Sequence, residues 1–361
     1  MGGIGRAVNL CYFTQRQIWS PGYVSQKLTD EGPLFRPSQS FFASKTNIRT
    51  EAVRLYRFAK DQSVVNVAGA KMGGQPGEMP TVLCGTIFYQ GHRIVEDEER
   101  GYFDEKRAEE LISRQSALSE ETGNPAVLHI YARTMAAFER YLNFVDVHWS
   151  GPVIFDSADP ATRKEMARLV SEIGYADKSI YNSVSLGMTF DEEEALLESE
   201  VDSAIVLAYN PADSSVEGTI RALKEGGSGQ KMGLLDLARS CGIENILIDP
   251  GVTPLGDGAG RALRVTVVAK SRFGLPVGSG IHNAVSSWSW LKEKGVTTRK
   301  CCDSASAAFQ ILAGGDFVLY GPIENAPLVF PIAAMADIMV SEGVRDLDIW
   351  PSPTHPINRL I

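Results

Sequence analysis

The sequence is poor in cysteine and has no two cysteines at the spacing that metal sites use. The five cysteines are odd in number and include no C-x-x-C pair, which excludes a disulfide framework and a zinc knuckle. Cys301 and Cys302 are adjacent, but neighbouring side chains converge poorly on one ion, so we expect no metal. Reduced thiols are typical of cytoplasmic proteins, and we expect a cytoplasmic location.

Long apolar runs and an excess of basic residues are also lacking. The most apolar stretch, residues 328–340, contains Pro331 and Asp337 and falls short of the ~20 residues that cross a bilayer. No compact apolar segment followed by a small-residue cleavage site opens the chain. The net charge is −9, whereas binding to nucleic acid relies on clustered lysine and arginine. We therefore expect neither membrane insertion nor a nucleic-acid partner.

The first part of the chain differs in composition from the rest. Residues 1–54 mix aromatic and basic residues with glycine, proline and serine, and contain no acidic residue before Asp30. They show no sustained helix or strand period, so we interpret them as a loosely ordered extension or a wrongly assigned start of the chain. A single domain is predicted over residues 55–343, followed by a C-terminal tail at 344–361.

Eight short apolar segments alternate with helical patterns along residues 81–342. The segments are continuous rather than alternating in polarity, which is typical of parallel strands buried on both faces. They are expected at 81–87, 126–131, 152–157, 179–184, 203–209, 245–249, 275–279 and 316–320. Helices are expected at 104–118, 134–145, 160–173, 192–198, 216–225, 234–241, 260–271, 284–294, 304–313 and 324–342. This order favours an α/β fold, a (β/α)8 TIM barrel, over the alternative of two doubly wound domains.

An amide or a carboxylate lies in or shortly after the carboxyl-terminal part of four of these segments: Asp156, Asn182, Asp249 and Asn283. One such residue after a strand is usually a turn or a helix cap. Four of them at the same place in successive repeats indicate a shared site, because barrel enzymes place their active site at the carboxyl ends of the strands. A carboxylate offers two acceptor oxygens in one plane, and an amide offers a donor and an acceptor, so together they suit a flat, nitrogen-rich heterocycle such as a pterin.

Longer motifs resemble a known family. The segments KMGGQPGEMPTVLCGTIFYQGHRIV, IDPGVTPLGDGAG and GLPVGSGIHNAVSSW resemble the H subunit of tetrahydromethanopterin S-methyltransferase (MtrH) and its bacterial relatives, over about residues 55–343. Those relatives are methylcorrinoid:tetrahydrofolate methyltransferases, including enzymes of glycine betaine demethylation. The resemblance implies a pterin-binding TIM barrel and a homodimer. We expect transfer of a methyl group from a methylcorrinoid to N5 of tetrahydrofolate in one-carbon metabolism.

The resemblance also implies roles for the four strand-end residues. Asp156, Asn182 and Asp249 match the residues with which pterin-binding barrels hold the pterin. Asn283 matches an asparagine near N5 and is the expected catalytic residue. The chain shows no D-x-H-x-x-G signature, so the cobalamin is expected on a separate corrinoid-carrier protein. Catalysis would then consist largely of positioning two reactants, without a dedicated general base or metal.

Further residues in the predicted strands or in the adjoining loops could line the pocket. The set contains Thr86, Tyr89, His92, Asn124, Asn210, Gly278, Ser279, Gly280 and His282. GDGAG at 256–260 follows a predicted strand and could cradle a phosphate, but its spacing is not G-x-G-x-x-G. A tight loop that shapes the pterin site is the favoured interpretation of that segment.

Two other functions stay open. The chain could be a catalytic or non-catalytic subunit of a membrane-associated tetrahydromethanopterin methyltransferase complex. It could also be a pterin transferase similar to dihydropteroate synthase, although no evident lysine or arginine stands where Asn283 lies.

Overall fold

The strands form a closed parallel barrel in the computed structural model, which describes residues 56–227 and 232–361. In chain order they are β3 (Val82–Ile87), β6 (Ala126–Tyr131), β7 (Val153–Asp156), β8 (Ser179–Ser185), β9 (Ser203–Leu207), β10 (Asn245–Asp249), β11 (Gly278–Ser279) and β12 (Phe317–Pro322). Each pairs with the next, β12 returns to β3, and a bridge from Ile248 to Val277 closes the ring between β10 and β11. The predicted (β/α)8 barrel is confirmed.

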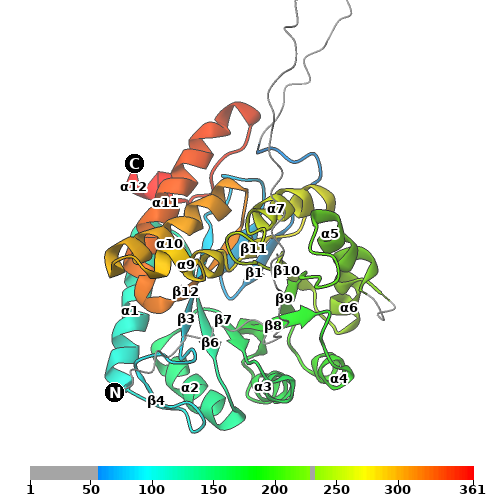
Figure 1. The fold of residues 1–361 in the computed structure, drawn as a ribbon, viewed down its shortest axis with the longest axis vertical. Helices are drawn as coiled ribbons and strands as arrows, with labels where there is room; N and C mark the ends of the chain where they lie inside the picture. Colours follow the sequence, from blue (N-terminus) through cyan, green and yellow to red (C-terminus); the bar gives the residue numbers. More distant parts are fainter. Residues whose placement is uncertain (1–55, 228–231) are drawn as a thin grey trace, which may run out of the picture.

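Helices surround this barrel, as the view in Figure 1 shows. They are α1 (Glu105–Thr122), α2 (Met135–His148), α3 (Pro160–Glu172), α4 (Phe190–Glu198), α5 (Val216–Glu225), α6 (Leu234–Ser240), α7 (Gly260–Phe273), α8 (His282–Ser286), α9 (Ser289–Lys292), α10 (Val296–Leu312) and α11 (Ala326–Gly343). Local sequence sets their ends: the Asp104 side chain caps α1 by accepting from the Arg107 amide, and Gly123 ends it in the left-handed conformation.

Alternate strand residues face the inside of the barrel, and this period places the functional side chains. Ile154, Ile180 and Leu247 belong to an interior apolar cluster, whereas Phe155 packs outward with the helices. Asp156, Asn182 and Asp249 lie two residues further along the same strands, so they point inward as well. A polar layer therefore lies directly above an apolar one.

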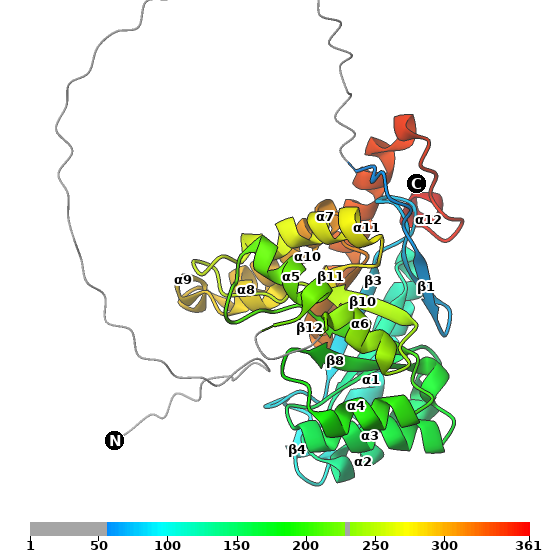
Figure 2. The same ribbon diagram turned by 90° about the vertical axis from the view of Figure 1, so that its right-hand side faces the viewer.

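A hairpin that the sequence pattern did not predict closes the amino-terminal end of the barrel. Its strands β1 (Val64–Val67) and β2 (Ala70–Gly73) are antiparallel, and Val65, Val67 and Met72 join the interior apolar cluster. In Figure 2 β1 lies at the opposite end of the barrel from α9. The other hairpin, β4 (Val95–Asp97) with β5 (Tyr102–Phe103), precedes α1.

A buried ion pair ties four segments together near this closed end. Lys270 of α7 is fully buried, and its Nζ lies 2.6 and 2.7 Å from the two carboxylate oxygens of Asp316. The same ammonium donates to the Gly74 carbonyl, and the carboxylate also accepts from the Val277 amide. Burial raises the pKa of Asp316, while the Lys270 charge acts against that rise. The pair joins α7 to the hairpin and to the starts of β11 and β12.

The C-terminal helices cover one side of the barrel. By length and composition, residues Ile323–Gly343 could cross a membrane. The apolar stretch of residues 328–340, which is too short to do so, is only part of this segment. About half of Ile323–Gly343 (56%) is buried against the barrel, and Asp337 within it is hydrogen-bonded, as in a core helix of a globular protein. Beyond it, η3 (Arg345–Leu347) and α12 (Pro356–Leu360) follow, and α12 packs on α1 and α11.

Candidate active site

The polar layer at the carboxyl ends of the strands begins with a chain of three side chains. The Thr86 hydroxyl lies 3.0 Å from Nδ1 of His129, and Nε2 of His129 lies 3.2 Å from Oδ2 of Asp156. His129 was not predicted, although a histidine inside the apolar strand AVLHIY was an available clue. Because a threonine hydroxyl can donate or accept, both the neutral and the charged imidazole are satisfied here.

Asn182 lies beside Asp156, its register partner across β7 and β8. Its side chain is buried, and its Oδ1 has no hydrogen-bond partner among the described residues. An unpartnered buried carbonyl oxygen is costly, so a donor on a bound molecule is the natural partner.

Asp249 ends β10 on the far side of the layer. It is 2% exposed, and its Oδ1 accepts a 2.8 Å hydrogen bond from the Gly251 amide. Burial raises the pKa of Asp249 to about 7, against the opposing effect of backbone hydrogen bonds from Gly251 and Gly280. A ligand that donates N–H groups to this carboxylate would favour its ionised form.

Asn283 lies in α8, just after β11, at the same end of the barrel. A Cβ on Gly280 would come within 2.8 Å of Nδ2 of Asn283, so the absence of a side chain at Gly280 leaves room for this amide.

Two neighbouring residues that were also predicted to line the pocket point away from it. Gly278 packs against β12, since a Cβ there would lie 2.1 Å from the Phe317 carbonyl oxygen. Ser279 donates to Gln310 of α10, so its hydroxyl points outward to the helix layer.

His282 is buried behind Asn283. Its Nδ1 lies 3.8 Å from Oδ1 of Asp303, and neither atom has a hydrogen-bond partner within the described ranges. Burial lowers the pKa of His282 to about 4, with a smaller contribution from His129, and burial raises the pKa of Asp303 to about 7. His282 is therefore neutral at physiological pH.

Tyr89 and His92 form a second group with Glu324, which was not predicted. His92 accepts from the Phe88 amide through Nδ1, and its Nε2 lies 3.0 Å from Glu324. The Tyr89 hydroxyl also donates to Glu324, and its ring stacks on His92. These contacts hold the pKa of Glu324 below its usual range despite its partial burial. They link the loop after β3 to the loop after β12.

Asn124 and Asn210 both use their side-chain amides in hydrogen bonds within the protein. The Asn210 amide braces its own loop, accepting from the Ala212 and Asp213 amides and donating to the Gly218 carbonyl. Asn124 precedes β6 at the opposite end of the barrel, where it donates to the Thr81 carbonyl and to Asp337. Asn124 also precedes the predicted strand at 126–131, which agrees with its place at the amino-terminal end of β6.

Replacing Asn124 with alanine is expected to lower the free energy of unfolding by about 1–3 kcal/mol and to leave pterin binding unchanged. The loss arises because Asp337, whose pKa burial raises to about 6, would lose one of its donors. Urea unfolding with a pterin titration of the folded variant measures both quantities. A large loss of pterin affinity in a stable variant would contradict the structural role.

Metal ligands do not gather in the part of the chain that the structure describes. No three histidine, cysteine, aspartate or glutamate side chains are placed there to share one ion. Cys301 is exposed and Cys302 half-buried, and both are free thiols.

Solved structures share this fold. Dihydropteroate synthase from Xanthomonas albilineans matches with a TM-score of 0.50 at 14% identity, covering 78% of this chain and 99% of that one. The Yersinia pestis enzyme matches with a TM-score of 0.51 at 12% identity, covering 76% and 98%. At these identities the likeness concerns the barrel alone.

Sequence relatives decide the family. The family model described as tetrahydromethanopterin S-methyltransferase MtrH matches residues 60–352. A Methanosarcina barkeri protein named as the H subunit of the methyltransferase mtx is 51% identical over 310 residues, which cover 85% of this chain and 100% of that protein. The H subunit of tetrahydromethanopterin S-methyltransferase from Methanothermobacter thermautotrophicus is 46% identical with the same coverage.

These relatives correct the predicted substrate. The expected methylcorrinoid:tetrahydrofolate activity is wrong, because the matching relatives named for a pterin are named for tetrahydromethanopterin. Both pterins present the same ring edge, so the strand-end residues could not separate them. The chain belongs to the MtrH family of methyltransferases.

Proposed function

We propose that this protein exchanges a methyl group between N5 of tetrahydromethanopterin and a corrinoid carried by a partner subunit. The observation that carries the proposal is the inward polar layer of Asp156, Asn182 and Asp249, in a barrel that the MtrH family model matches over residues 60–352. Among the described residues, the Asn182 oxygen in this layer has no hydrogen-bond partner. The multisubunit setting is supported by the names of the relatives, which are H subunits.

The side chains suit the two edges of a reduced pterin. The Asp249 carboxylate can accept from the 2-amino group and N3–H, since these donors lie side by side as carboxylate oxygens do. Asn182 supplies its free oxygen to a further ring N–H. Asp156, fixed by His129, takes a neighbouring donor. Burial of Asn182 and Asp249 makes their hydrogen bonds stronger than they would be in water.

Asn283 is the residue proposed for the reacting nitrogen. A methylcorrinoid held by a partner would supply the methyl group and keep the electron pair of its carbon–cobalt bond. When the methyl group is transferred to the pterin, N5 would gain the methyl group and lose one proton to solvent. The Asn283 amide holds the N5 lone pair in line and can donate a hydrogen bond to it in the reverse direction. No corrinoid signature lies in the sequence, so a partner brings the corrinoid to the barrel mouth.

Replacing Asn283 with alanine is expected to slow methyl transfer about 10- to 100-fold while changing the dissociation constant of the pterin less than about threefold. The reason is that this amide acts at the reacting nitrogen, whereas the ring is held by the other strand ends. Single-turnover kinetics with methylcobalamin and tetrahydromethanopterin give the rate, and fluorescence titration gives the affinity.

The Arg264→Ala variant is the matched control, because this exposed arginine on α7 touches none of the four residues. An unchanged rate for Asn283→Ala would remove that residue from the mechanism. A wild-type protein that binds no reduced pterin would refute the proposed function itself.

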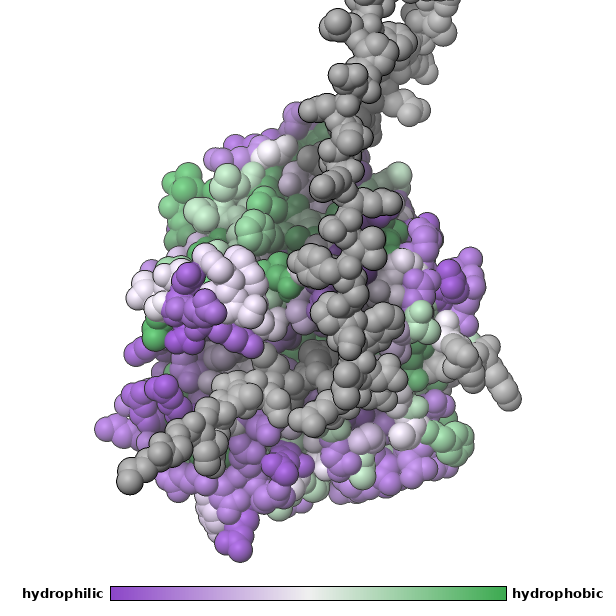
Figure 3. All heavy atoms as spheres, in the orientation of Figure 1, coloured by the Kyte–Doolittle hydropathy of each residue, from purple (hydrophilic) through white to green (hydrophobic). Residues whose placement is uncertain are grey.

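An exposed apolar face supports association with other subunits. Phe309 of α10 and Met335 and Met339 of α11 are each more than half exposed, and Figure 3 shows apolar surface gathered over this side of the molecule. We propose that this face takes part in a homodimer within the complex. Sedimentation of Met335→Lys against wild type tests it, and an unchanged mass would contradict it. A cytoplasmic location without membrane insertion remains part of the proposal.

A further inference from the structure

Loops at the carboxyl-terminal opening of the barrel leave large apolar side chains in solvent. Phe190, the first residue of α4, is 73% exposed, and Leu255, in the loop after β10, is 41% exposed. Trp290 of α9, which follows β11, is 48% exposed. All three lie at the end of the barrel where the polar layer opens. Large apolar residues that gather at one end of a protein indicate an interaction surface, whereas scattered single ones need no explanation.

Trp290 belongs to an aromatic pair on a projecting segment. Its ring stacks on Trp288 with the centroids 4.6 Å apart, and the Lys294 ammonium lies 4.4 Å from the centroid of the Trp290 ring. Figure 2 shows α9 at the edge of the molecule, beyond α8. Stacking restricts the indole before any partner arrives, which reduces the entropy cost of burying it in an interface. Tryptophan is also enriched among the residues that dominate binding energy at interfaces.

Positive charge surrounds this pair. Residues 291–300, LKEKGVTTRK, hold four lysine or arginine residues against Glu293 alone, in a chain whose net charge is −9. Lys292, Arg299 and Lys300 are exposed, and within residues 56–227 and 232–361 none of the four cations pairs with a carboxylate. A basic segment without counter-charges, on an acidic protein, favours a partner surface of negative charge. We call residues 288–300 the α9 segment.

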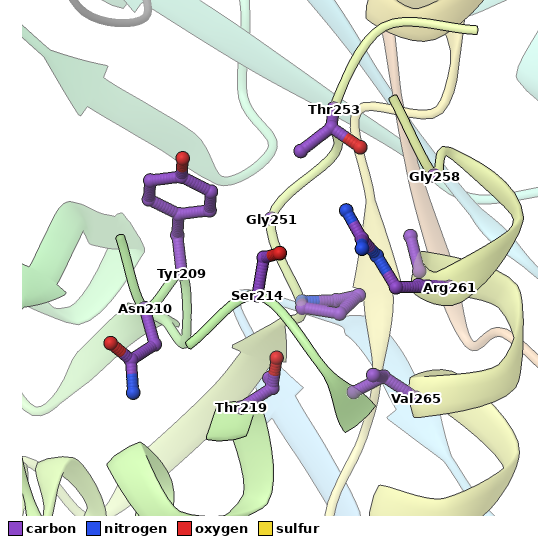
Figure 4. A pocket seen from close by; sticks show the side chains of 11 residues that line it. Tyr209, Asn210, Ser214, Thr219, Gly251, Thr253, Gly258, Arg261 and Val265 are labelled. Carbon is purple, nitrogen blue, oxygen red and sulfur yellow. The ribbon is translucent and has the colours of Figure 1, made fainter. Parts of the chain in front are cut away.

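The start of α7 adds another cation to this end of the barrel. Figure 4 shows the Arg261 side chain beside Thr253 of the loop after β10, and a Cβ on Gly258 would lie 2.3 Å from its Cζ. Its Nη2 donates to the Asp257 carbonyl, and no carboxylate of the described chain forms an ion pair with it. The cavity beside it has a volume of about 20 Å³, which is room for a water molecule. Arg261 therefore contributes charge to the surface rather than to an enclosed ligand site.

The reaction indicates which partner this surface meets. The polar layer opens at this end, because the β1–β2 hairpin packs Val65, Val67 and Met72 into the other end of the barrel. The chain shows no D-x-H-x-x-G signature, so the corrinoid belongs to another protein. A protein that brings a corrinoid to N5 has to pass the loops that carry the exposed apolar residues and the α9 segment.

We propose that the α9 segment, with Trp290 at its centre, is the docking surface for an acidic face of the corrinoid-carrying subunit. The inference rests on the proposed function, because it takes that subunit to be the methyl donor. Trp290 is buried against the carrier, and the lysines and Arg299 around it steer the approach. Phe190, Leu255 and Arg261 contribute further contacts from neighbouring loops. Docking then uses residues other than those that hold the pterin.

The test compares a methyl donor that has the carrier with one that lacks it. Methyl transfer to tetrahydromethanopterin by the full chain is measured with the methylated corrinoid subunit of a tetrahydromethanopterin S-methyltransferase and, separately, with free methylcobalamin. Trp290→Ala is expected to lower kcat/KM for the carrier about tenfold or more, because a buried tryptophan anchor is lost, and to change the rate with free methylcobalamin less than about twofold.

Trp350→Ala is the matched control. Trp350 is 69% exposed, and the nearby Ser352 amide donates to the Glu78 carbonyl, which precedes β3 at the opposite end of the barrel. This variant is expected to change neither rate. The double variant Lys292→Gln with Lys300→Gln is expected to lower kcat/KM for the carrier about three- to tenfold at low salt, and to weaken the dependence of that constant on ionic strength.

Other occupants of the surface give different results. An equal effect of Trp290→Ala with both donors, or no effect with either, would overturn the inference. Self-association that Trp290→Ala abolishes in sedimentation would assign the surface to a second copy of the chain instead. Binding to vesicles of phosphatidylglycerol and phosphatidylcholine that depends on Trp290 would assign it to a membrane. If wild type used free methylcobalamin but not the carrier, the docking inference alone would fail. If it used neither donor, the proposed function would fail, and the docking inference with it.

Discussion

Asp249→Asn is expected to weaken pterin binding about 100-fold and, at the same time, to make the free protein more stable at pH 8. The loss of affinity follows from the exchange of two charge-assisted hydrogen bonds, each contributing about 1.5–3 kcal/mol, for weaker or mismatched ones. The gain in stability follows from the cost of an ionised carboxylate that is 2% exposed and bonded to the Gly251 amide.

The pH dependence has a definite sign. The pKa of Asp249 is about 7 in the folded chain and 3.8 as the ordinary value, so between these values the folded state holds a proton that the unfolded state has lost. The contribution of this group to the free energy of unfolding therefore falls as pH rises from about 4 to 7 and stays low above that. The Asp249→Asn variant has no group that titrates here, so its free energy of unfolding does not fall in this way. The difference amounts to about 2–4 kcal/mol at pH 8.

Urea unfolding of wild type and Asp249→Asn at pH 5 and pH 8, with no pterin present, measures the effect. The stability gap should be largest at pH 8 and less than half as large at pH 5. Pterin affinity of wild type should decrease as pH falls below 7, because the binding form is the carboxylate, whereas the variant should show no such dependence in this range. If the difference in free energy of unfolding between the variant and wild type did not depend on pH, Asp249 would be ionised throughout this range.

Lys270→Met is expected to lower the free energy of unfolding by about 3–5 kcal/mol, because it leaves the buried Asp316 carboxylate without its counter-charge. The Gly74 carbonyl would also lose its donor, which loosens the hairpin at the closed end of the barrel. Thermal and urea unfolding measure the loss, and the pterin affinity of the protein that remains folded should be unchanged.

The double variant Lys270→Met with Asp316→Leu is the control for the charge. Removing both partners leaves no buried charge, so it should recover part of the stability that the single variant loses. The Val277 amide still loses its acceptor, which limits that recovery. A double variant that is less stable than Lys270→Met would show that the pair acts through its hydrogen bonds rather than through its charge.

The barrel could be predicted because buried parallel strands read as continuous apolar runs, and all but one of the eight strands lie within two residues of their expected bounds at both ends. The departures have physical reasons. The predicted strand at 275–279 shrinks to two residues, since Pro276 lacks an amide hydrogen to donate. The predicted helix at 284–294 is two short helices, and α10 begins at Val296, eight residues before its expected start. The β1–β2 hairpin was missed because its short strands, VVNV and AKMG, contain asparagine, lysine and glycine, which are depleted in strands.

The site was predictable where strand position determines side-chain direction. Asp156, Asn182 and Asp249 end strands whose alternation turns them inward. His129 and Glu324 were missed because only the fold brings them close to Asp156 and His92, and the polar residue inside the apolar strand AVLHIY was the one clue to His129. The substrate was misjudged because the strand-end residues suit the ring edge that both pterins share, so they carry no information on which of the two is bound.

The hairpin at the amino-terminal end has a kinetic consequence. With Val65, Val67 and Met72 packed into that end, a molecule reaches the polar layer through the carboxyl-terminal opening. On the proposed function, the corrinoid of the partner would approach N5 through the same opening, over a pterin that lies beneath it. Methyl exchange would then follow a compulsory order, in which the pterin arrives first and cannot depart until the partner has left.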